Sequence, residues 1–240
     1  MKRLFVAVLL VAAFACDVSS AQFGGGTLFY IGEPVRSSPA VGVDGLLYVC
    51  ADDWRLYAFD TTKRTRLWEF PVNPGSSPVP VVGINGTVYV SAGNSRRKMY
   101  ALDGKTGSKL WEFDAGWVIE SAPAVDSNGN VFFGRVGVWE PSGRYYGRIY
   151  GLNGKDGSEI WNITVPNSVT DSPVLDLDGT LFVANIALDS GTGATKWITG
   201  REGHEGQTPA LSATGLVYTG GSPALGADGT VHFGAGSISR

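Results

Sequence analysis

The fold is decided by the stretch Ala101-Leu102-Asp103-Gly104-Lys105-Thr106-Gly107-Ser108-Lys109-Leu110-Trp111, in which Asp103 stands eight positions before Trp111. The same spacing between an Asp or Asn and a tryptophan recurs at Asp60 and Trp68, Asn153 and Trp161, and Asp189 and Trp197. An apolar run precedes each Asp or Asn, and a turn sequence follows it. Because an Asx side chain can bond its own backbone and glycine can adopt a left-handed conformation, each copy predicts two strands joined by a tight turn.

A second recurring pattern lies upstream of each Asx-to-tryptophan segment. It consists of a proline segment, a short apolar run and an Asp-Gly or Asn-Gly pair, and such a pair between apolar runs predicts a β-hairpin. The pairs are Asp44-Gly45, Asn85-Gly86, Asn128-Gly129, Asp178-Gly179 and Asp228-Gly229, with Thr214-Gly215 as a weaker copy. A column of aromatic residues follows them, at Tyr48, Tyr89, Phe132, Phe182 and Tyr218, and ends at His232. The column predicts a packed core layer, so His232 is interpreted as a core residue and not as a catalytic one.

Each complete unit therefore contains four short strands. Repeats of about 36–50 residues with four antiparallel strands are typical of the blades of a β-propeller. The predicted fold class is all-β: a β-propeller of four-stranded antiparallel blades, with about five to six partial or complete blades. The predicted units span 37–71, 76–114, 121–164, 171–199, 208–219 and 222–236, within a propeller domain of residues 22–240.

The closure of the ring is left open by the sequence. Phe29 stands nine positions before Ser38, just as Trp68 stands nine positions before Ser77, so residues 27–31 align with the last strand of a unit. The last two units lack the Asx-to-tryptophan half. The sequence thus predicts an open or truncated ring, in which strand edges are exposed. Arg64 also replaces the turn glycine of the other copies, which predicts a looser turn in the first unit.

The stretch 101–111 and its copies resemble the repeat of the pyrroloquinoline-quinone (PQQ) repeat family, the tryptophan-docking, quinoprotein alcohol dehydrogenase-like propellers. The resemblance covers residues 27 to about 236. It implies that the tryptophan of one blade docks on the neighbouring blade, a structural role that would fall on Trp68, Trp111, Trp161 and Trp197. One branch of the family comprises dehydrogenases that bind PQQ and calcium. Another branch is cofactor-free and includes the lipoprotein subunit of the bacterial outer-membrane β-barrel assembly machinery.

Composition excludes several other classes of protein. The chain has 240 residues, with 34 glycines, 17% charged residues, 11% aromatic residues and a formal net charge of −3. Abundant aromatic residues and few charges argue against a disordered chain and against a coiled coil. A small negative net charge provides no basic field, so no nucleic-acid partner is predicted.

The N-terminus has the features of a signal peptide over residues 1–21. Two basic residues precede a 12-residue apolar run, Leu4 to Ala15, which is too short for a transmembrane helix of about 20 residues. Cleavage after Ala21 predicts an extracellular or periplasmic protein with no transmembrane segment. Lipidation at Cys16 is a weaker alternative. Without Cys16 the only thiol is Cys50, whose apolar strand predicts a buried side chain.

Candidate catalytic and metal-ligating groups are sparse. The chain has no adjacent cysteines, only two histidines, and no cluster of Asp, Asn and Glu with the spacing of a calcium loop. Residues 104–106 read Gly-Lys-Thr, but they lie in the repeat turn and lack the upstream glycine of a phosphate-binding loop. His204 and Glu205 are interpreted as part of a solvated loop. We therefore predict no enzyme activity, no cofactor and no metal site.

Binding is the function that the sequence favours. The longest insertion lies in the third unit and contains Trp139, Arg144, Tyr145 and Tyr146, while Arg96 and Arg97 occupy the equivalent loop of the second unit. Trp, Tyr and Arg are the residue types enriched at interface hot spots. These residues predict a surface for a protein or carbohydrate partner on a non-catalytic, exported scaffold. Two alternatives stay open: a truncated fragment of a PQQ-dependent quinoprotein dehydrogenase, and a periplasmic lipoprotein scaffold in outer-membrane protein assembly.

Overall fold

The computed structural model describes Phe29 and residues 31–35, 37–72, 78–92, 97–139, 143, 145–183 and 186–198, together with the backbone of four short strands between 210 and 232. The described residues form strands and turns, which confirms the all-β class. The predicted signal peptide, Cys16, Arg96, Arg144, His204 and Glu205 lie outside the described residues, as do the side chains of Tyr218 and His232.

Four sheets of four antiparallel strands make up the blades of the protein. Blade 1 contains β1 (Ala40–Val41), β2 (Leu46–Ala51), β3 (Arg55–Asp60) and β4 (Thr65–Pro71). Blade 2 contains β5 (Val81–Val82), β6 (Thr87–Ala92), β7 (Lys98–Asp103) and β8 (Lys109–Asp114). Blade 3 contains β9 (Ala124–Val125), β10 (Val131–Trp139), β11 (Tyr145–Leu152) and β12 (Glu159–Val165). Blade 4 contains β13 (Val174–Leu175), β14 (Thr180–Val183), β15 (Ile186–Asp189) and β16 (Thr195–Ile198).

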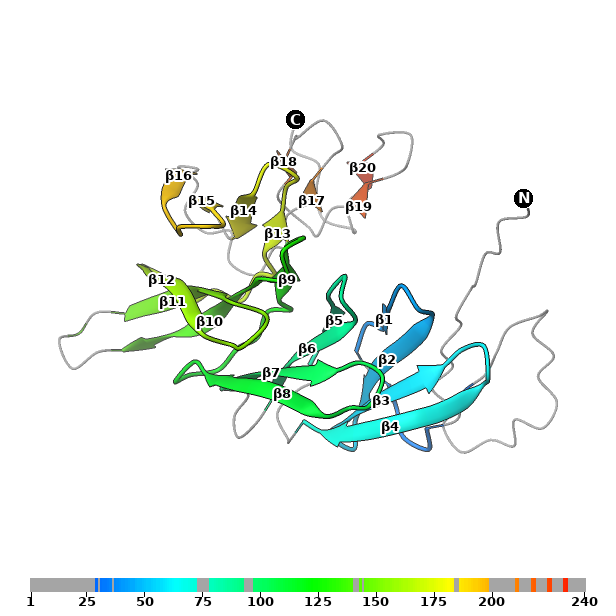
Figure 1. The fold of residues 1–240 in the computed structure, drawn as a ribbon. Coiled ribbons are helices and arrows are strands. Elements are labelled where there is room, and N and C mark those ends of the chain that lie inside the picture. Colours follow the sequence, from blue (N-terminus) through cyan, green and yellow to red (C-terminus); the bar gives the residue numbers. More distant parts are fainter. Residues whose placement is uncertain are drawn as a thin grey trace.

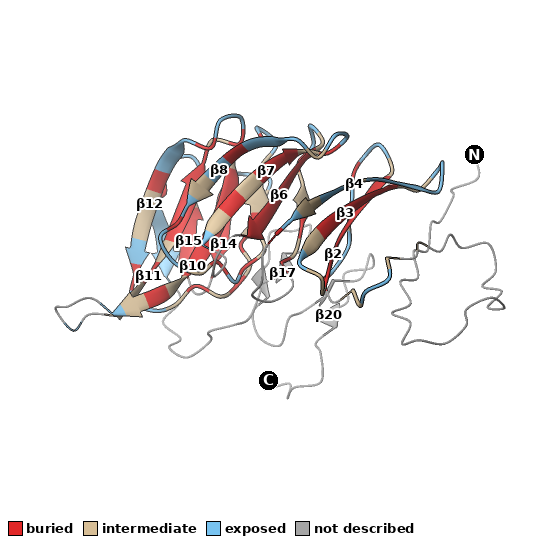
Figure 2. Cartoon of the chain, turned by 90° about the horizontal axis from the view of Figure 1, so that it is seen from below, coloured by how far each residue is buried: buried red, intermediate tan, exposed pale blue. Residues whose placement is uncertain are grey.

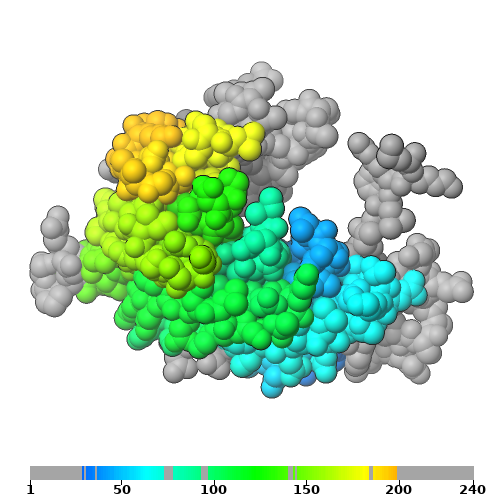
Figure 3. All heavy atoms as spheres, viewed as in Figure 1, coloured from blue at the N-terminus to red at the C-terminus, as the bar shows by residue number. Residues whose placement is uncertain are grey.

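Two further sheets follow, each of two strands. They pair β17 (Ala210–Leu211) with β18 (Val217–Tyr218), and β19 (Ala224–Leu225) with β20 (Val231–His232). Figure 1 shows the four blades in chain order around a common centre, with β1, β5, β9 and β13 on the inner side. The blades form an arc of adjacent blocks in the space-filling view of Figure 3, and the described residues do not close it into a ring.

The core lies between consecutive blades. Tyr48 and Leu56 of blade 1, for example, pack with Val90 and Leu102 of blade 2 in one buried cluster. Two further clusters join blade 2 to blade 3 and blade 3 to blade 4. Figure 2 shows that the buried residues lie in the middle strands of each blade, whereas the outer strands β4 and β12 carry many exposed ones. Each large apolar side chain buried in this way contributes about 1.5–3 kcal/mol relative to leaving it in water.

A β-bulge in the outer strand directs each tryptophan. In blade 1, Trp68 pairs with Ala58 while Arg66 pairs with Phe59, so Leu67 is an extra residue in β4. The register shifts at the same point in the other three blades. Bulges of this kind re-aim the neighbouring side chain. The residue opposite the tryptophan is small each time, which leaves room for the indole to lie across the strand; the pairs are Ala58 with Trp68, Ala101 with Trp111, Gly151 with Trp161 and Ala187 with Trp197.

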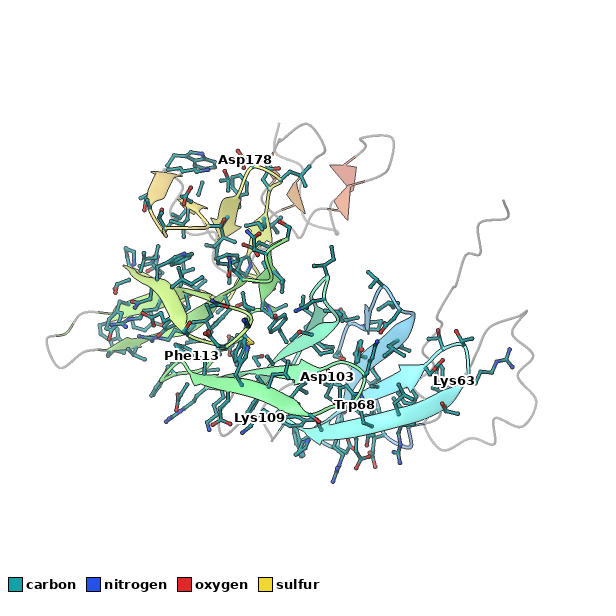
Figure 4. The ribbon with its side chains drawn as sticks, viewed as in Figure 1. Lys63, Trp68, Asp103, Lys109, Phe113 and Asp178 are labelled. Atoms are coloured by element: carbon teal, nitrogen blue, oxygen red, sulfur yellow. The ribbon has the colours of Figure 1, made fainter. Side chains whose placement is uncertain are left out.

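Three of these indoles reach the turn of the next blade. In Figure 4, Trp68 of β4 lies beside the turn of blade 2 that begins at Asp103. In each case the indole Nε1–H donates to a backbone carbonyl of that turn. The pairs are Trp68 with Gly104 at 2.8 Å, Trp111 with Gly154 at 2.8 Å and Trp161 with Ser190 at 2.7 Å. Each indole also lies against a glycine with positive φ, namely Gly107, Gly157 or Gly193. These contacts connect each blade to the next through a residue pair that is far apart in the sequence.

The two ends of the arc differ from these interfaces. On blade 1 the position of the turn glycine holds Arg64, which adopts φ +59°. The turn therefore keeps the left-handed residue of its copies instead of loosening. Phe29 packs against Phe59 with ring centroids 4.7 Å apart, and with Ile31 and Val35 it covers this face of blade 1. At the other end Trp197 is 44% exposed and packs on Phe182 of its own blade.

Candidate partner-binding surface on blade 3

Blade 3 carries the longest hairpin of the described blades. Strand β10 has nine residues and β11 has eight, whereas β2 and β3 of blade 1 have six each. The extra length carries the ends of β10 and β11 beyond the body of the blade, as Figure 1 shows. The last two ladder pairs are Val138 with Tyr146 and Trp139 with Tyr145. The three aromatic residues of the predicted binding loop, Trp139, Tyr145 and Tyr146, are thus strand residues, held in register at the end of a ladder.

Trp139 and Tyr145 form an aromatic pair at the end of this ladder. Their ring centroids lie 5.1 Å apart, and Trp139 is 73% exposed. The hydroxyl of Tyr145 hydrogen-bonds the Oγ of Ser168 at 2.5 Å, and Ser168 Oγ also accepts from the backbone N of Gly137 at 2.9 Å. A Cβ at Gly137 would lie 2.6 Å from the Tyr145 ring, so glycine is needed for the ring to lie there. An exposed indole on a rigid support is typical of interface anchors.

Two arginines lie on one face of the same hairpin. Arg135 and Arg148 are directly opposite each other in the ladder between β10 and β11. Their guanidinium carbons lie over the ring of Tyr146, at 5.2 Å and 5.8 Å from its centroid. Arg135 is only 5% exposed, whereas Arg148 and Tyr146 are half-buried. Cations over an aromatic face are attracted by the ring quadrupole.

The loop of blade 2 that precedes β9 runs beside these arginines. The backbone N of Val136 donates to the carbonyl of Val118 at 2.8 Å, and the Tyr150 hydroxyl donates to the carbonyl of Ala115 at 3.2 Å. Trp117 of this loop is 47% exposed. Arg97, predicted as a partner residue, forms an ion pair with Asp114 at 2.7 Å, with both groups at the surface.

The partner residues predicted from the sequence do not include Arg135, Arg148 or Trp117. The first two are visible in the sequence as cations in strands that are otherwise rich in apolar and aromatic residues, but only the register between β10 and β11 places them opposite each other. The contact of the loop 115–119 with β10 was not predictable either, because it depends on how two blades pack.

The groups expected of an enzyme do not converge in the described residues. Among them, no three or more His, Cys, Asp or Glu side chains are grouped so that they could hold a metal ion. Burial, followed by the nearby Asp53, raises the pKa of the Cys50 thiol far above its usual value, which keeps it protonated in the core. Asp126 and Asp178 accept backbone hydrogen bonds within their own turns.

Family membership follows from a sequence comparison. The model of the family described as "Outer membrane protein assembly factor BamB" matches residues 30–134 and 100–235. The chain belongs to this family. No curated protein sequence matches it. The predicted family of PQQ-repeat propellers is thereby confirmed.

Solved structures of low sequence identity have a similar fold. Hydrazine synthase from Kuenenia stuttgartiensis is 13% identical, with a TM-score of 0.62 over 83% of this chain and 59% of that chain. Quinohemoprotein alcohol dehydrogenase from Comamonas testosteroni is 19% identical, with a TM-score of 0.54 over 78% of this chain and 39% of that chain. BamB from Moraxella catarrhalis is 16% identical, with a TM-score of 0.48 over 85% of this chain and 74% of that chain. This chain thus spans less than two thirds of the first two structures, and the likeness to them shows the fold alone.

Proposed function

We propose that the protein is a non-catalytic scaffold that binds a protein partner through the end of blade 3. The observation that carries the proposal is the exposed indole of Trp139, held against Tyr145 on a hairpin longer than those of blades 1 and 2. Membership of the BamB family supports a protein partner over a carbohydrate, and it supports a periplasmic location and a role in outer-membrane protein assembly. Export by the predicted signal peptide 1–21, with or without lipidation at Cys16, belongs to the same proposal. In the described residues, no helix is long and apolar enough to cross a membrane.

The surface also has the mechanical properties that a docking site needs. Tyr145 is fixed by Ser168, and Gly137 is fixed by the same hydroxyl, so little side-chain freedom remains to be lost when a partner binds. Arg97 lies at the surface of the neighbouring blade and is assigned to the rim of the proposed interface. Arg96 and Arg144, which lie outside the described residues, are assigned to the same rim from the sequence alone. Rim charges of this kind influence the rate of association more than the affinity.

Site-specific photo-cross-linking in cells tests this proposal. Benzoylphenylalanine is placed at position 139 of the full chain, and in a matched control at position 177. Leu177 is fully exposed in the turn between β13 and β14. This turn joins the first two strands of blade 4, whereas Trp139 lies where the second and third strands of blade 3 are joined, at the other end of a blade. We expect a defined adduct with an outer-membrane assembly protein from position 139 and none from position 177. Equal labelling at both positions, or no adduct at 139, would contradict the proposal.

A further inference from the structure

A charge pattern that blades 1 and 2 share is altered in blade 3. The third strand of blade 1 begins with Arg55, which forms an ion pair with Glu69 at 2.5 Å. The third strand of blade 2 begins with Lys98, which forms an ion pair with Glu112 at 2.6 Å. In both blades the glutamate follows the docking tryptophan by one position. The residue opposite the cation on the second strand is an alanine, Ala51 or Ala92.

Blade 3 has the cation but has lost its carboxylate. Arg148 stands at the position of Arg55 and Lys98, two residues before the tyrosine that pairs with the outer strand. The residue paired with that tyrosine is Asn162, where blades 1 and 2 have Glu69 and Glu112. Asn162 donates its amide to Glu159 at 2.6 Å. The alanine of the second strand is replaced as well, by Arg135.

The result is two facing cations in the ladder between β10 and β11. Ion pairs elsewhere among the described residues involve Arg55, Lys63, Arg66, Arg97, Lys98 and Lys109. The buried Nε atoms of Arg135 and Arg148 have no hydrogen-bond partner, and Arg135 donates from Nη1 to the carbonyl of Val136 at 3.0 Å. Like charges directly opposite in a ladder destabilise it, and arginine cannot lose its proton in a protein. A buried cation is stable when an anion with good geometry compensates it.

Blades 1 and 2 show how a cation over a tyrosine ring is compensated there. Arg66 lies over the ring of Tyr57 at 5.6 Å, just as Arg148 lies over Tyr146, but Arg66 is paired with Glu69 at 3.2 Å. Lys109 lies over Tyr100 at 5.9 Å and is paired with Glu112 at 2.6 Å. In blades 1 and 2, therefore, a carboxylate of the protein accompanies each cation that lies over a tyrosine.

We propose that Arg135, Arg148 and Tyr146 form a binding site for a carboxylate, supplied by an acidic side chain of the protein partner. The fork of one guanidinium group matches the two oxygens of a carboxylate, and the remaining lone pairs of the carboxylate can accept from a second guanidinium. A phosphate is usually held by several free backbone N–H groups as well. The nearby amides are already engaged: Val136 N with Val118 O, Gly137 N with Ser168 Oγ, and Val169 N with Arg135 O. The assignment of the carboxylate to a protein partner rests on the proposed function. The binding of a carboxylate at this site is inferred independently of it.

Arginine side-chain NMR of the purified protein tests the site directly. The probes are a blocked pentapeptide of alanines with a central glutamate, the same peptide with glutamine, and inorganic phosphate. We expect the Nε–H signals of Arg135 and Arg148 to shift saturably with the glutamate peptide and to respond little to the glutamine peptide. The signal of Arg66, which already has Glu69, should stay in place.

Two pairs of variants control for a loss of folding. Asn162→Glu restores the carboxylate that blades 1 and 2 carry, so it should fold and occupy Arg148 from within the chain. It should lower the affinity of the protein for the glutamate peptide by about tenfold or more, as expected for the loss of a charged hydrogen bond. Asn162→Gln should leave this affinity unchanged. Arg148→Gln should lower the affinity for the glutamate peptide by a similar factor, and Arg66→Gln should leave it unchanged.

Three results would overturn the proposal. The first is an equal response to the glutamate and glutamine peptides. The second is undiminished binding in Asn162→Glu, and the third is saturation by phosphate at lower concentration than by the glutamate peptide. The two proposals can fail separately. Peptide binding without cross-linking at position 139 would support the carboxylate site and contradict the proposed protein partner. Cross-linking at position 139 without peptide binding would contradict the carboxylate site alone.

Discussion

Gly157 lies against the indole of Trp111, and a Cβ at Gly157 would lie 2.7 Å from Cδ2 of that indole. The same tryptophan donates its Nε1–H to the carbonyl of Gly154 at 2.8 Å. The glycine of a turn in blade 3 is thus required by a side chain of blade 2. Gly107 and Gly193 stand in the same relation to Trp68 and Trp161. The turns of the repeat therefore serve the joints between blades as well as the hairpins within them.

Gly157→Ala should destabilise the protein through two effects. A non-glycine residue with φ near +74° costs about 1–2 kcal/mol, and forcing a methyl group into the indole adds about 1–3 kcal/mol. Gly116→Ala is the matched control, since Gly116 has the same φ of +74° and nothing within 4 Å of its Cβ position. Urea unfolding should show the larger loss for Gly157→Ala. Equal losses would mean that the indole contact contributes nothing.

At the interface between blades 1 and 2, the hydroxyl of a tyrosine occupies the space that a Cβ would need. Tyr48 donates to the carbonyl of Gly104 at 3.0 Å, and a Cβ at Gly104 would lie 2.5 Å from that hydroxyl. Between blades 3 and 4 the corresponding pair is Phe132 and Ser190. Phe132 lacks the tyrosine hydroxyl, and Ser190 has the Cβ that Gly104 lacks. Phe132→Tyr should therefore destabilise the native chain but be tolerated in a Ser190→Gly background.

A double-mutant cycle measures this coupling. The two substitutions should be non-additive by about 1 kcal/mol or more, as is typical of residues in contact. Additive effects in urea unfolding would show that the two side chains do not compete for the same space.

Alkaline pH should weaken the protein through Tyr48. Burial, with smaller effects of Asp44 and Asp103, raises the pKa of Tyr48 to about 12. The folded-state pKa lies above the unfolded value of about 10. The contribution to stability is therefore complete below about pH 10 and is lost as the pH rises from about 10 to about 12. The difference in unfolding free energy between the native chain and Tyr48→Phe should shrink over this interval, and parallel curves would exclude Tyr48 as the cause.

Arg64→Gly should stabilise blade 1. Arg64 adopts φ +59° where three other turns have glycine. Relieving a left-handed non-glycine residue gains about 1–2 kcal/mol, and the greater freedom of glycine in the unfolded chain offsets about 0.5–1 kcal/mol. A net gain of up to about 1.5 kcal/mol in urea unfolding is expected. A loss would indicate that the Arg64 side chain makes a stabilising contact that outweighs the backbone strain.

Much of the fold could be predicted from the sequence because each local signal repeats. The Asx-Gly turns, the aromatic column and the Asx-to-tryptophan spacing all favour the same four-stranded unit, and agreement between local signals is typical of a specific fold. The fourth unit, which is short in sequence, still forms four strands, of which β14, β15 and β16 have four residues each. The bulge that exposes Leu67 was not predictable from a pattern of apolar residues, since it depends on the register between β3 and β4.

The candidate site was predicted less completely. Trp139, Tyr145 and Tyr146 were identified by residue type and by the length of the insertion, and their assignment to a binding surface remains a prediction. The carboxylate that blade 3 lacks is visible in the sequence as Asn162 in place of Glu69 and Glu112. Its meaning requires the ladder, because only the register places Arg135 opposite Arg148 and Asn162 at the position of the two glutamates.

Cross-linking from position 139 in two backgrounds is the most direct test of the account. The full chain with benzoylphenylalanine at 139 is compared with the same chain carrying Asn162→Glu, at equal expression in cells. We predict a defined protein adduct from the first and a loss of about tenfold or more of that adduct in the second. Absence of any adduct at position 139 in the first chain would contradict the central claim that the end of blade 3 binds a protein partner.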